Sequence, residues 1–213
     1  MEDIIELYSK EYSEKYPVIN MDEQPFQRLS DTKEFLPVKK GSIKKEDHEY
    51  KRHGTACIFM FTEALQGWRK VTVRKRRTSI DWANEIEKLL VDDYPNAEVV
   101  TLISDNLNTH TIASLYKAFP PKRARELAQR LDMRHTPKHG SWLNIAECEL
   151  SVLTRQCLCK RIPTIEELQK IVAQWHEDRN NRQKGVDWRF TNEDARIKLK
   201  SLYPKIQLSQ TQC

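Results

Sequence analysis

The chain has 213 residues, of which 38% are hydrophobic and 31% charged, a composition typical of one large soluble domain. No apolar run approaches the roughly 18 residues that a transmembrane helix needs, and the acidic amino-terminal segment excludes a secretory signal. The formal charge of +5 is compatible with a polyanionic partner but is weak evidence by itself. The odd number of cysteines and the absence of paired CxxC motifs predict free thiols rather than a zinc site, at Cys57, Cys148, Cys157, Cys159 and Cys213.

The first third of the chain predicts a helix followed by three strands. Residues 2–16 form an amphipathic pattern that a proline ends, and residues 17–22 read as a short buried strand that ends on an acid. Residues 27–54 are polar and rich in Lys, Asp and Gly, which predicts a long loop or insertion. Two strands at residues 55–62 and 67–73, joined by a short turn, are expected to form a hairpin.

The rest of the chain alternates helices with strands. A helix begins near Ser79, a plausible N-cap, and ends at Tyr94-Pro95. The continuous apolar run at residues 98–105 is typical of a strand covered on both faces and again ends on an acid, and a shorter strand is predicted at residues 133–136. Helices are predicted at residues 111–119, 122–131, 143–158, 164–182 and 192–202. This order indicates one α/β domain with a mixed sheet.

Three carboxylates stand where they could share one edge of that sheet. Asp22 and Asp105 each follow a strand, and Glu147 lies early on the helix after the last short strand. Clustered carboxylates repel one another unless a cation joins them, and their hard oxygen atoms suit Mg²⁺ or Mn²⁺. Two such ions about 4 Å apart can activate an attacking oxygen and stabilise the leaving oxygen of a phosphodiester.

Each acid also has a plainer interpretation or a rival. A single Asp after a strand is commonly a turn or helix-cap residue, although the polar segment that follows Asp105 is unusually rich in caps. Glu23 competes with Asp22, but neighbouring strand residues face opposite sides of a sheet. Glu149 competes with Glu147, but two helical steps turn the side chain by about 200°, so only one of them can face the site.

Two segments together resemble a known family. Asp105-Asn-Leu-Asn-Thr-His110, followed by Thr136-Pro-Lys-His-Gly-Ser-Trp-Leu-Asn-Ile-Ala-Glu147, resembles the DDE transposases of bacterial insertion sequences related to the mariner superfamily. Asp22, in Asn-Met-Asp-Glu, matches the first acid of that family. The resemblance spans roughly residues 17–205. Ile145 stands where many relatives have proline, and the 41 residues between the second and third acids are more than is usual.

The resemblance implies a fold, a reaction and a metal. We expect a ribonuclease-H-like fold, a mixed five-stranded sheet flanked by helices, over residues 17–185, with a helix or linker at 1–16 and a basic tail at 186–213. The expected activity is cleavage of DNA strands at transposon ends and strand transfer into target DNA. Asp22, Asp105 and Glu147 are the expected catalytic residues and the ligands of two Mg²⁺ or Mn²⁺ ions.

Further residues are assigned supporting or DNA-binding roles. Asn106, His110 and Asn144 are expected to support the acids, although helix capping and a satisfied structural histidine are alternatives. Basic clusters beside a DNA-processing site favour contacts with the DNA backbone, although solvated loops and, for the tryptophan, plain packing are alternatives. The candidate DNA-binding residues are Lys39, Lys40, Lys44, Lys45, Arg74, Lys75, Arg76, Arg77, Lys138, His139 and Trp142.

The expected partner is double-stranded DNA, both the inverted-repeat ends of a transposon and the target, bound by a homodimer in the bacterial cytoplasm at the nucleoid, without a membrane. The helix-turn-helix modules of mariner-like enzymes have no room before Asp22. We therefore expect a catalytic portion whose helix-turn-helix portion is encoded separately or lost. Two alternatives stay open: a catalytically silent DNA-binding or assembly relic of a truncated transposase, and a generic ribonuclease-H-like nuclease acting on RNA–DNA hybrids.

Overall fold

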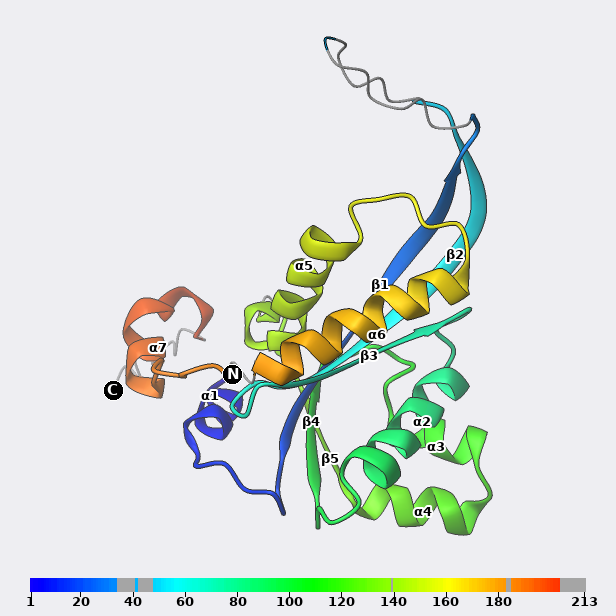
Figure 1. Ribbon diagram of the computed structural model, residues 1–213. Coiled ribbons are helices and arrows are strands. Elements are labelled where there is room, and N and C mark those ends of the chain that lie inside the picture. The colour runs from blue at the N-terminus through cyan, green and yellow to red at the C-terminus, as the bar shows by residue number, and fades with distance from the viewer. Residues whose placement is uncertain (34–40, 42–47, 139, 183–184, 204–213) are drawn as a thin grey trace, which may run out of the picture.

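The computed structural model describes residues 1–33, 41, 48–138, 140–182 and 185–203, and it contains a five-stranded sheet with helices on both faces (Figure 1). The strand order is β3-β2-β1-β4-β5. The first three strands pair antiparallel, whereas β4 runs parallel to β1 and β5 runs parallel to β4. The expected mixed five-stranded sheet is confirmed, with strands β1 (Val18–Asp31), β2 (Tyr50–Glu63), β3 (Trp68–Arg74), β4 (Val100–Ser104) and β5 (Leu131–His135).

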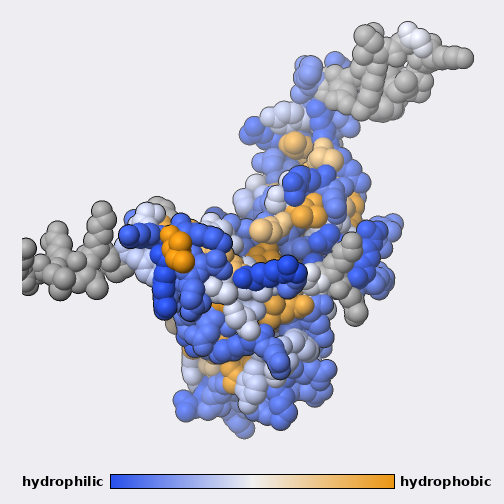
Figure 2. Space-filling model, turned by 90° about the vertical axis from the view of Figure 1, so that its left-hand side faces the viewer, coloured by the Kyte–Doolittle hydropathy of each residue, from blue (hydrophilic) through white to orange (hydrophobic). Residues whose placement is uncertain are grey.

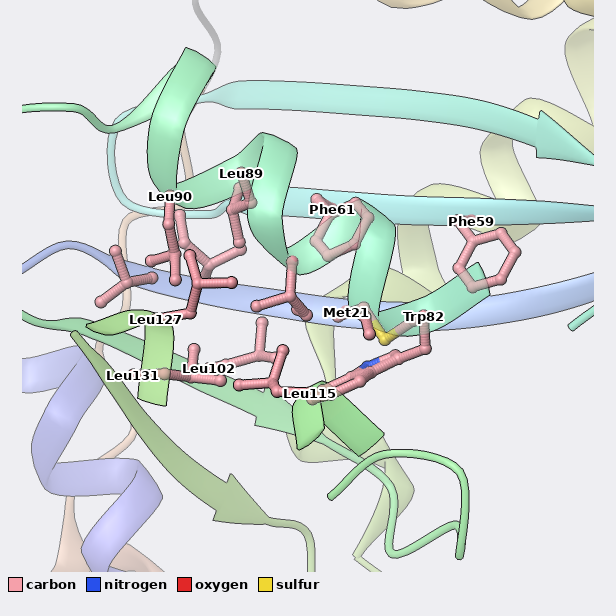
Figure 3. Close-up of a cluster of buried hydrophobic side chains, with 14 of the residues drawn as sticks. Met21, Phe59, Phe61, Trp82, Leu89, Leu90, Leu102, Leu115, Leu127 and Leu131 are labelled. Carbon is pink, nitrogen blue, oxygen red and sulfur yellow. The ribbon is translucent and has the colours of Figure 1, made fainter. Parts of the chain in front are cut away.

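Alternation along the strands divides the core into two layers. In β2, Phe59 and Phe61 pack in one cluster with Trp82, whereas Ile58 and Met60 pack in another. The first cluster, shown in Figure 3, joins the sheet to helices α2, α3 and α4, and the second joins it to α5 and α6. Burial on both faces explains the continuous apolar sequence of β2 and β4. The helices are α2 (Ser79–Lys88), α3 (Ile112–Ala118), α4 (Pro121–Gln129), α5 (Ile145–Cys157) and α6 (Ile165–Arg182).

The two terminal helices, α1 (Glu2–Ser9) and α7 (Asn192–Lys198), lie side by side near one end of the sheet (Figure 1). They share a third apolar cluster, in which Ile5 of α1 and Ala195 of α7 pack with Ile103 of β4 and Leu143. The Tyr8 hydroxyl lies 2.6 Å from the carbonyl oxygen of Leu143. The first helix is therefore anchored to the strands that carry the site, although it ends at Ser9 and not at residue 16 as expected.

The prediction of a loop over residues 27–54 was wrong for both ends of that segment. β1 continues to Asp31 and β2 begins at Tyr50, so residues 27–31 pair with residues 50–55 in an extension that we call the arm. The arm projects beyond the body of the sheet in Figure 1. Most of its side chains are polar and lie outside the apolar clusters, so backbone pairing and polar contacts, such as Ser30 Oγ with His53 Nε2 at 2.8 Å, hold the two strands together.

Contacts at the base of the arm hold it against the body. The Leu29 amide donates to the Ile162 carbonyl oxygen at 3.2 Å, and Arg161 pairs with Asp31 at 2.5 Å. A register shift between Gln27 and Leu29 lies beside Gly54, whose φ of +83° is a conformation that glycine adopts readily.

The remaining elements are short turns of helix. A π-helical segment, Leu89–Asp93, continues α2, and 3-10 turns form at Ser141–Leu143 and Lys200–Leu202. On the face seen in Figure 2, hydrophobic residues appear as small groups within a largely hydrophilic surface. Over the described residues, no helix has the length and apolar character to cross a membrane.

Candidate active site

Strand β1 directs Asp22 toward helix α5. In the sheet, Asp22 lies opposite Met60, which packs under α5 and α6, whereas the preceding Met21 packs on the other face. Side chains alternate along a strand, so Asp22 faces the α5 layer. Its carboxylate is partly buried, and Oδ1 accepts a hydrogen bond of 2.7 Å from the backbone amide of Glu23.

Asn144 fixes the start of α5 against β1. Its buried side chain accepts from the Ala146 amide at 3.2 Å as the helix N-cap, and its Nδ2 donates to the Met21 carbonyl oxygen at 3.0 Å. These two bonds tie the first turn of α5, which carries the exposed Glu147, to the residue before Asp22. The expected supporting role of Asn144 thus has a geometric basis in both of its amide atoms.

Asp22 and Glu147 line one groove of about 410 Å³, which we call the α5 groove. It runs beside successive turns of the helix, since positions 147, 151 and 155 are spaced four residues apart and share one helical face. Its lining residues are Asp22, Glu23, Gln24, Glu147, Leu150, Ser151, Thr154 and Arg155.

Asp105 follows β4, the parallel neighbour of β1. The register pairs Asn20 with Ile103, so the end of β4 at Ser104 lies beside the part of β1 that carries Asp22. The prediction that the first strand ends on Asp22 was wrong, because pairing with β2 continues β1 to Asp31. The electrostatic surroundings of Asp22 agree: burial, together with the negative charges of Asp105 and Glu147, raises the pKa of Asp22 to about 6. The structure therefore brings the three predicted acids into one region.

His110 lies behind Asp105 rather than in the groove. Its ring is fully buried, with Nδ1 3.1 Å from Oδ1 of Asp105 and Nε2 2.9 Å from Oε1 of Glu23. Burial lowers the pKa of His110, but the hydrogen bonds to the two carboxylates outweigh it and raise the pKa to about 9. A buried ring cannot contact a phosphate, so the support that His110 gives is to Asp105.

The rivals of the predicted acids have other partners. Glu149 points away from the groove into an ion pair with Arg69 at 3.0 Å and with Arg179 at 2.9 Å, which joins α5 to β3 and α6. Glu23 lies on the α2 and α3 face of the sheet with His110. The strand and helix periods thus separate Asp22 from Glu23 and Glu147 from Glu149, as the sequence predicted.

The donor set fits a hard divalent cation in chemistry but is not a closed cage. All three side chains offer carboxylate oxygens, and burial together with the negative charges of Asp105 and Glu147 raises the pKa of Asp22. Within the described residues, no group of three or more His, Cys, Asp or Glu side chains is arranged so that it could hold a metal ion.

The predicted DNA-binding residues have different surroundings. Arg74 is partly buried and pairs with Glu85 at 2.5 Å and with Asp81 at 3.9 Å, so its assignment to DNA is not retained. Trp142 is 39% exposed and packs edge-on against Phe190 at 5.7 Å between ring centroids, which supports the packing alternative in part. Lys75, Arg76, Arg77 and Lys138 are exposed, whereas Lys39, Lys40, Lys44, Lys45 and His139 lie outside the described residues.

Sequence reasoning gave Glu23 and Arg155 no function. Glu23 was set aside because it faces away from Asp22. Its contact with His110, which is 87 residues further along the chain, could not be read from the sequence. Arg155 could have been found from its spacing of eight residues from Glu147, which places both on one face of α5.

Asn106, which was expected to support the acids, is exposed, and no hydrogen bond engages its side chain in the described part of the chain. Among the described cysteines, Cys57, Cys148, Cys157 and Cys159 are free, as expected.

Comparisons with known proteins agree with this geometry. The family model of the DDE superfamily endonucleases matches residues 17–169. No curated protein matches the sequence. Among solved structures, the paired-end complex of the Mos1 mariner transposase with Mn is similar with a TM-score of 0.56 and 13% identity, over 83% of this chain and 52% of that chain.

Two more Mos1 structures are similar. The paired-end complex with Mg has a TM-score of 0.54 and 12% identity, over 85% of this chain and 55% of that chain. The catalytic domain of Mos1 has a TM-score of 0.53 and 10% identity, over 83% of this chain and 76% of that chain. These likenesses show the fold, so the expected ribonuclease-H-like architecture is confirmed. The chain spans about half the length of the Mos1 chains in the paired-end complexes.

Proposed function

Because the chain belongs to the DDE superfamily of endonucleases, whose model matches residues 17–169, we propose that it is the catalytic domain of a mariner-like transposase. It cleaves DNA strands at transposon ends and transfers them into target DNA. The observation that carries the proposal is the convergence of Asp22 within β1, Asp105 just after the parallel strand β4, and Glu147 in the first turn of α5.

The three acids together coordinate two Mg²⁺ or Mn²⁺ ions. Asp22 is set on a central strand and partly buried, so it supplies a fixed oxygen donor, whereas Glu147 extends from the exposed side of α5. Asp105 is 43% exposed and points one oxygen toward His110, which leaves the other for the shared edge. When bound, divalent ions lower the pKa of an attacking water or hydroxyl and offset charge on the phosphodiester.

The α5 groove seats the strand that is cut. Ser151 and Arg155 follow Glu147 on the same helical face, and both are exposed. In the described part of the chain no hydrogen bond or ion pair engages the Arg155 guanidinium, so it is available to a phosphate of the DNA. A phosphate contact here orients the scissile bond relative to Asp22 without reading its sequence.

Double-stranded DNA is the proposed partner, as transposon ends and as target. Exposed Lys75, Arg76, Arg77 and Lys138 are the described candidates for backbone contact, and the cluster at residues 39–45 is a candidate by sequence. Transposition holds two ends together, so we propose a homodimer on DNA. The Mos1 complexes, which are paired-end assemblies, support this arrangement.

A cleavage assay with Asp105→Asn tests the proposed function. The substrate is a supercoiled plasmid carrying the inverted repeats that flank the gene, incubated with Mg²⁺. We expect the parent to nick it and Asp105→Asn to lose activity, because an amide is a poorer ligand of a hard cation. Asp187→Asn, an exposed acid paired only with Arg189 in the described residues, is the matched control and should cleave normally. Retained cleavage by Asp105→Asn would contradict the proposal.

The same preparation separates the two alternatives. DNA binding in a band-shift assay without cleavage, by a protein with all three acids intact, indicates a silent assembly module. Preferential cleavage of an RNA–DNA hybrid over duplex DNA indicates a generic ribonuclease-H-like nuclease. The proposed function requires cleavage of the duplex ends.

A further inference from the structure

Glu23 lies on the opposite face of β1 from Asp22 but reaches the second acid of the site through one side chain. Its Oε1 is 2.9 Å from Nε2 of His110, and Nδ1 of the same ring is 3.1 Å from Oδ1 of Asp105. The side chains of Glu23 and His110 are 2% and 0% exposed, respectively. A continuous Glu23–His110–Asp105 chain of contacts therefore connects the interior of the sheet to the metal-binding edge.

The His110 ring links the two acids through both of its nitrogens. Each ring nitrogen lies within hydrogen-bond distance of one carboxylate oxygen, Nε2 with that of Glu23 and Nδ1 with that of Asp105. The contact also gives the buried Glu23 side chain a polar partner, because a buried polar group without one is costly. Trp82 stacks on the ring at 5.9 Å between centroids with an interplanar angle of 24°, which fixes its plane.

The carboxylate of Asp105 needs such a support. Asp105 is the first residue after β4, its side chain is 43% exposed, and the His110 contact is the one hydrogen bond to its carboxylate in the described part of the chain. Without a partner the carboxylate would rotate freely, and ordering it around a cation would cost conformational entropy. Groups that orient a metal ligand from behind commonly change metal affinity by about 10–100-fold.

We propose that Glu23 is a positioning residue that, through His110, holds Oδ1 of Asp105 and turns Oδ2 toward the metal site. This inference rests on the proposed function, since it deepens the role of Asp105 as a ligand. The neighbouring residues Asp22 and Glu23 then have different roles. Side chains alternate along the strand, so Asp22 faces the site and Glu23 faces His110, which contacts Asp105.

Binding of Mn²⁺ alone, measured by isothermal titration calorimetry on the full chain, tests the proposal without a cleavage assay. Glu23→Ala removes the acceptor and should weaken Mn²⁺ binding by about 10-fold. Glu23→Gln keeps an amide group that can bond Nε2 and should restore most of the affinity. Equal losses in the two variants, or no loss in Glu23→Ala, would overturn the proposal.

A second buried glutamate provides the matched control. Glu85 of α2 is 1% exposed and pairs with Arg74, so Glu85→Ala removes a buried ion pair of similar kind away from Asp105. It should lower the melting temperature and leave Mn²⁺ affinity within about twofold of the parent, because loss of a distant ion pair affects stability rather than the ligand. A comparable loss of Mn²⁺ affinity in Glu85→Ala would reduce the Glu23 effect to general destabilisation and so overturn the proposal.

The exchange rate of a ring N–H proton of His110 reports on its hydrogen bond even in a variant that is slightly destabilised. ¹⁵N-edited NMR of the parent and of Glu23→Gln should show a slowly exchanging Nε2–H proton, because the side-chain oxygen at position 23 accepts a hydrogen bond from Nε2, and Glu23→Ala should lose it. Persistence of that proton in Glu23→Ala would show that the His110 ring is held without Glu23, against the proposal. Asp105→Asn separates the two levels of inference: if it binds Mn²⁺ like the parent, the proposed function fails, whereas a loss there without a loss in Glu23→Ala removes only the role of Glu23.

Discussion

At the scale of single residues, the charge of Asp22 is costly when no cation is bound. Burial comes first among the causes, and the neighbouring Asp105 and Glu147 add repulsion, so its pKa stands at about 6 against an ordinary value of 3.8. The folded state therefore binds a proton more tightly than the unfolded state. The resulting stability is fully present below pH 3.8 and is lost as the pH rises through 6.

Asp22→Asn is accordingly expected to stabilise the metal-free protein. At pH 7.5 the gain in free energy of unfolding should be on the order of 1–2 kcal/mol, and it should vanish near pH 4. The variant should also lose the rise in melting temperature that Mg²⁺ gives the parent, since a ligand stabilises only the state that binds it. Thermal melts with and without Mg²⁺ across this pH range provide the measurement. A destabilised variant that still responds to Mg²⁺ would contradict the assignment of Asp22.

Arg155 offers a second test at this scale. Arg155→Ala should weaken binding to duplex DNA and reduce the slope of log affinity against log salt by about 1, because one phosphate contact is removed. Fluorescence anisotropy over a salt series measures both. Arg125→Ala on the remote helix α4 is the control and should change neither. An unchanged salt slope in Arg155→Ala would show that Arg155 does not contact a DNA phosphate.

The sequence predicted the direction of a side chain correctly where strand alternation or the helical turn determines it. It failed where a contact between residues far apart in the chain determines the role. Strand alternation separated Asp22 from Glu23, and the helical turn separated Glu147 from Glu149. The same alternation led to the neglect of Glu23, whose partner His110 becomes visible only when β1 and the segment after β4 are folded together. Likewise, Arg74 looked like part of a DNA-binding run until α2 supplied its carboxylate partners.

At the scale of elements, the site depends on how α5 begins. The side chain of Asn144 caps the helix and also donates a hydrogen bond to β1. One residue therefore both starts α5 and positions it against the sheet. Polar caps of this kind were readable from the sequence. The contact with the Met21 carbonyl oxygen was not, because it joins residues 123 positions apart.

Asn144→Ala should therefore affect stability and activity together. Loss of the cap costs about 1–2 kcal/mol in the free energy of unfolding, measured by urea denaturation. Cleavage by the folded variant should also fall, because Glu147 is no longer held relative to Asp22. Thr191→Ala, which removes the comparable cap of α7, should lower stability and leave cleavage unchanged. Full cleavage by Asn144→Ala would show that the cap does not place Glu147.

The arm shows the limit of element prediction from hydropathy. Residues 27–31 and 50–55 have no apolar alternation because neither face is covered, and a pattern of burial cannot reveal strands that are held by backbone pairing. The inner part of β2 was predicted correctly, because residues 56–62 are buried.

At the scale of the whole molecule, two parallel strands and one helix converge on an edge of the sheet while the two apolar layers hold them in place. The sequence predicted that Asp22 and Asp105 would lie side by side if their strands were neighbours, and β1 and β4 are neighbours in the sheet, although β1 continues past Asp22. The proposed function therefore requires that Asp22, Asp105 and Glu147 together bind divalent metal.

Anomalous diffraction from crystals of the protein soaked in Mn²⁺ measures this binding. We expect Mn²⁺ peaks bounded by the carboxylates of Asp22, Asp105 and Glu147, and we expect them to disappear in crystals of Asp105→Asn. Mn²⁺ bound elsewhere on the molecule, with none among these three side chains at saturating concentration, would contradict it.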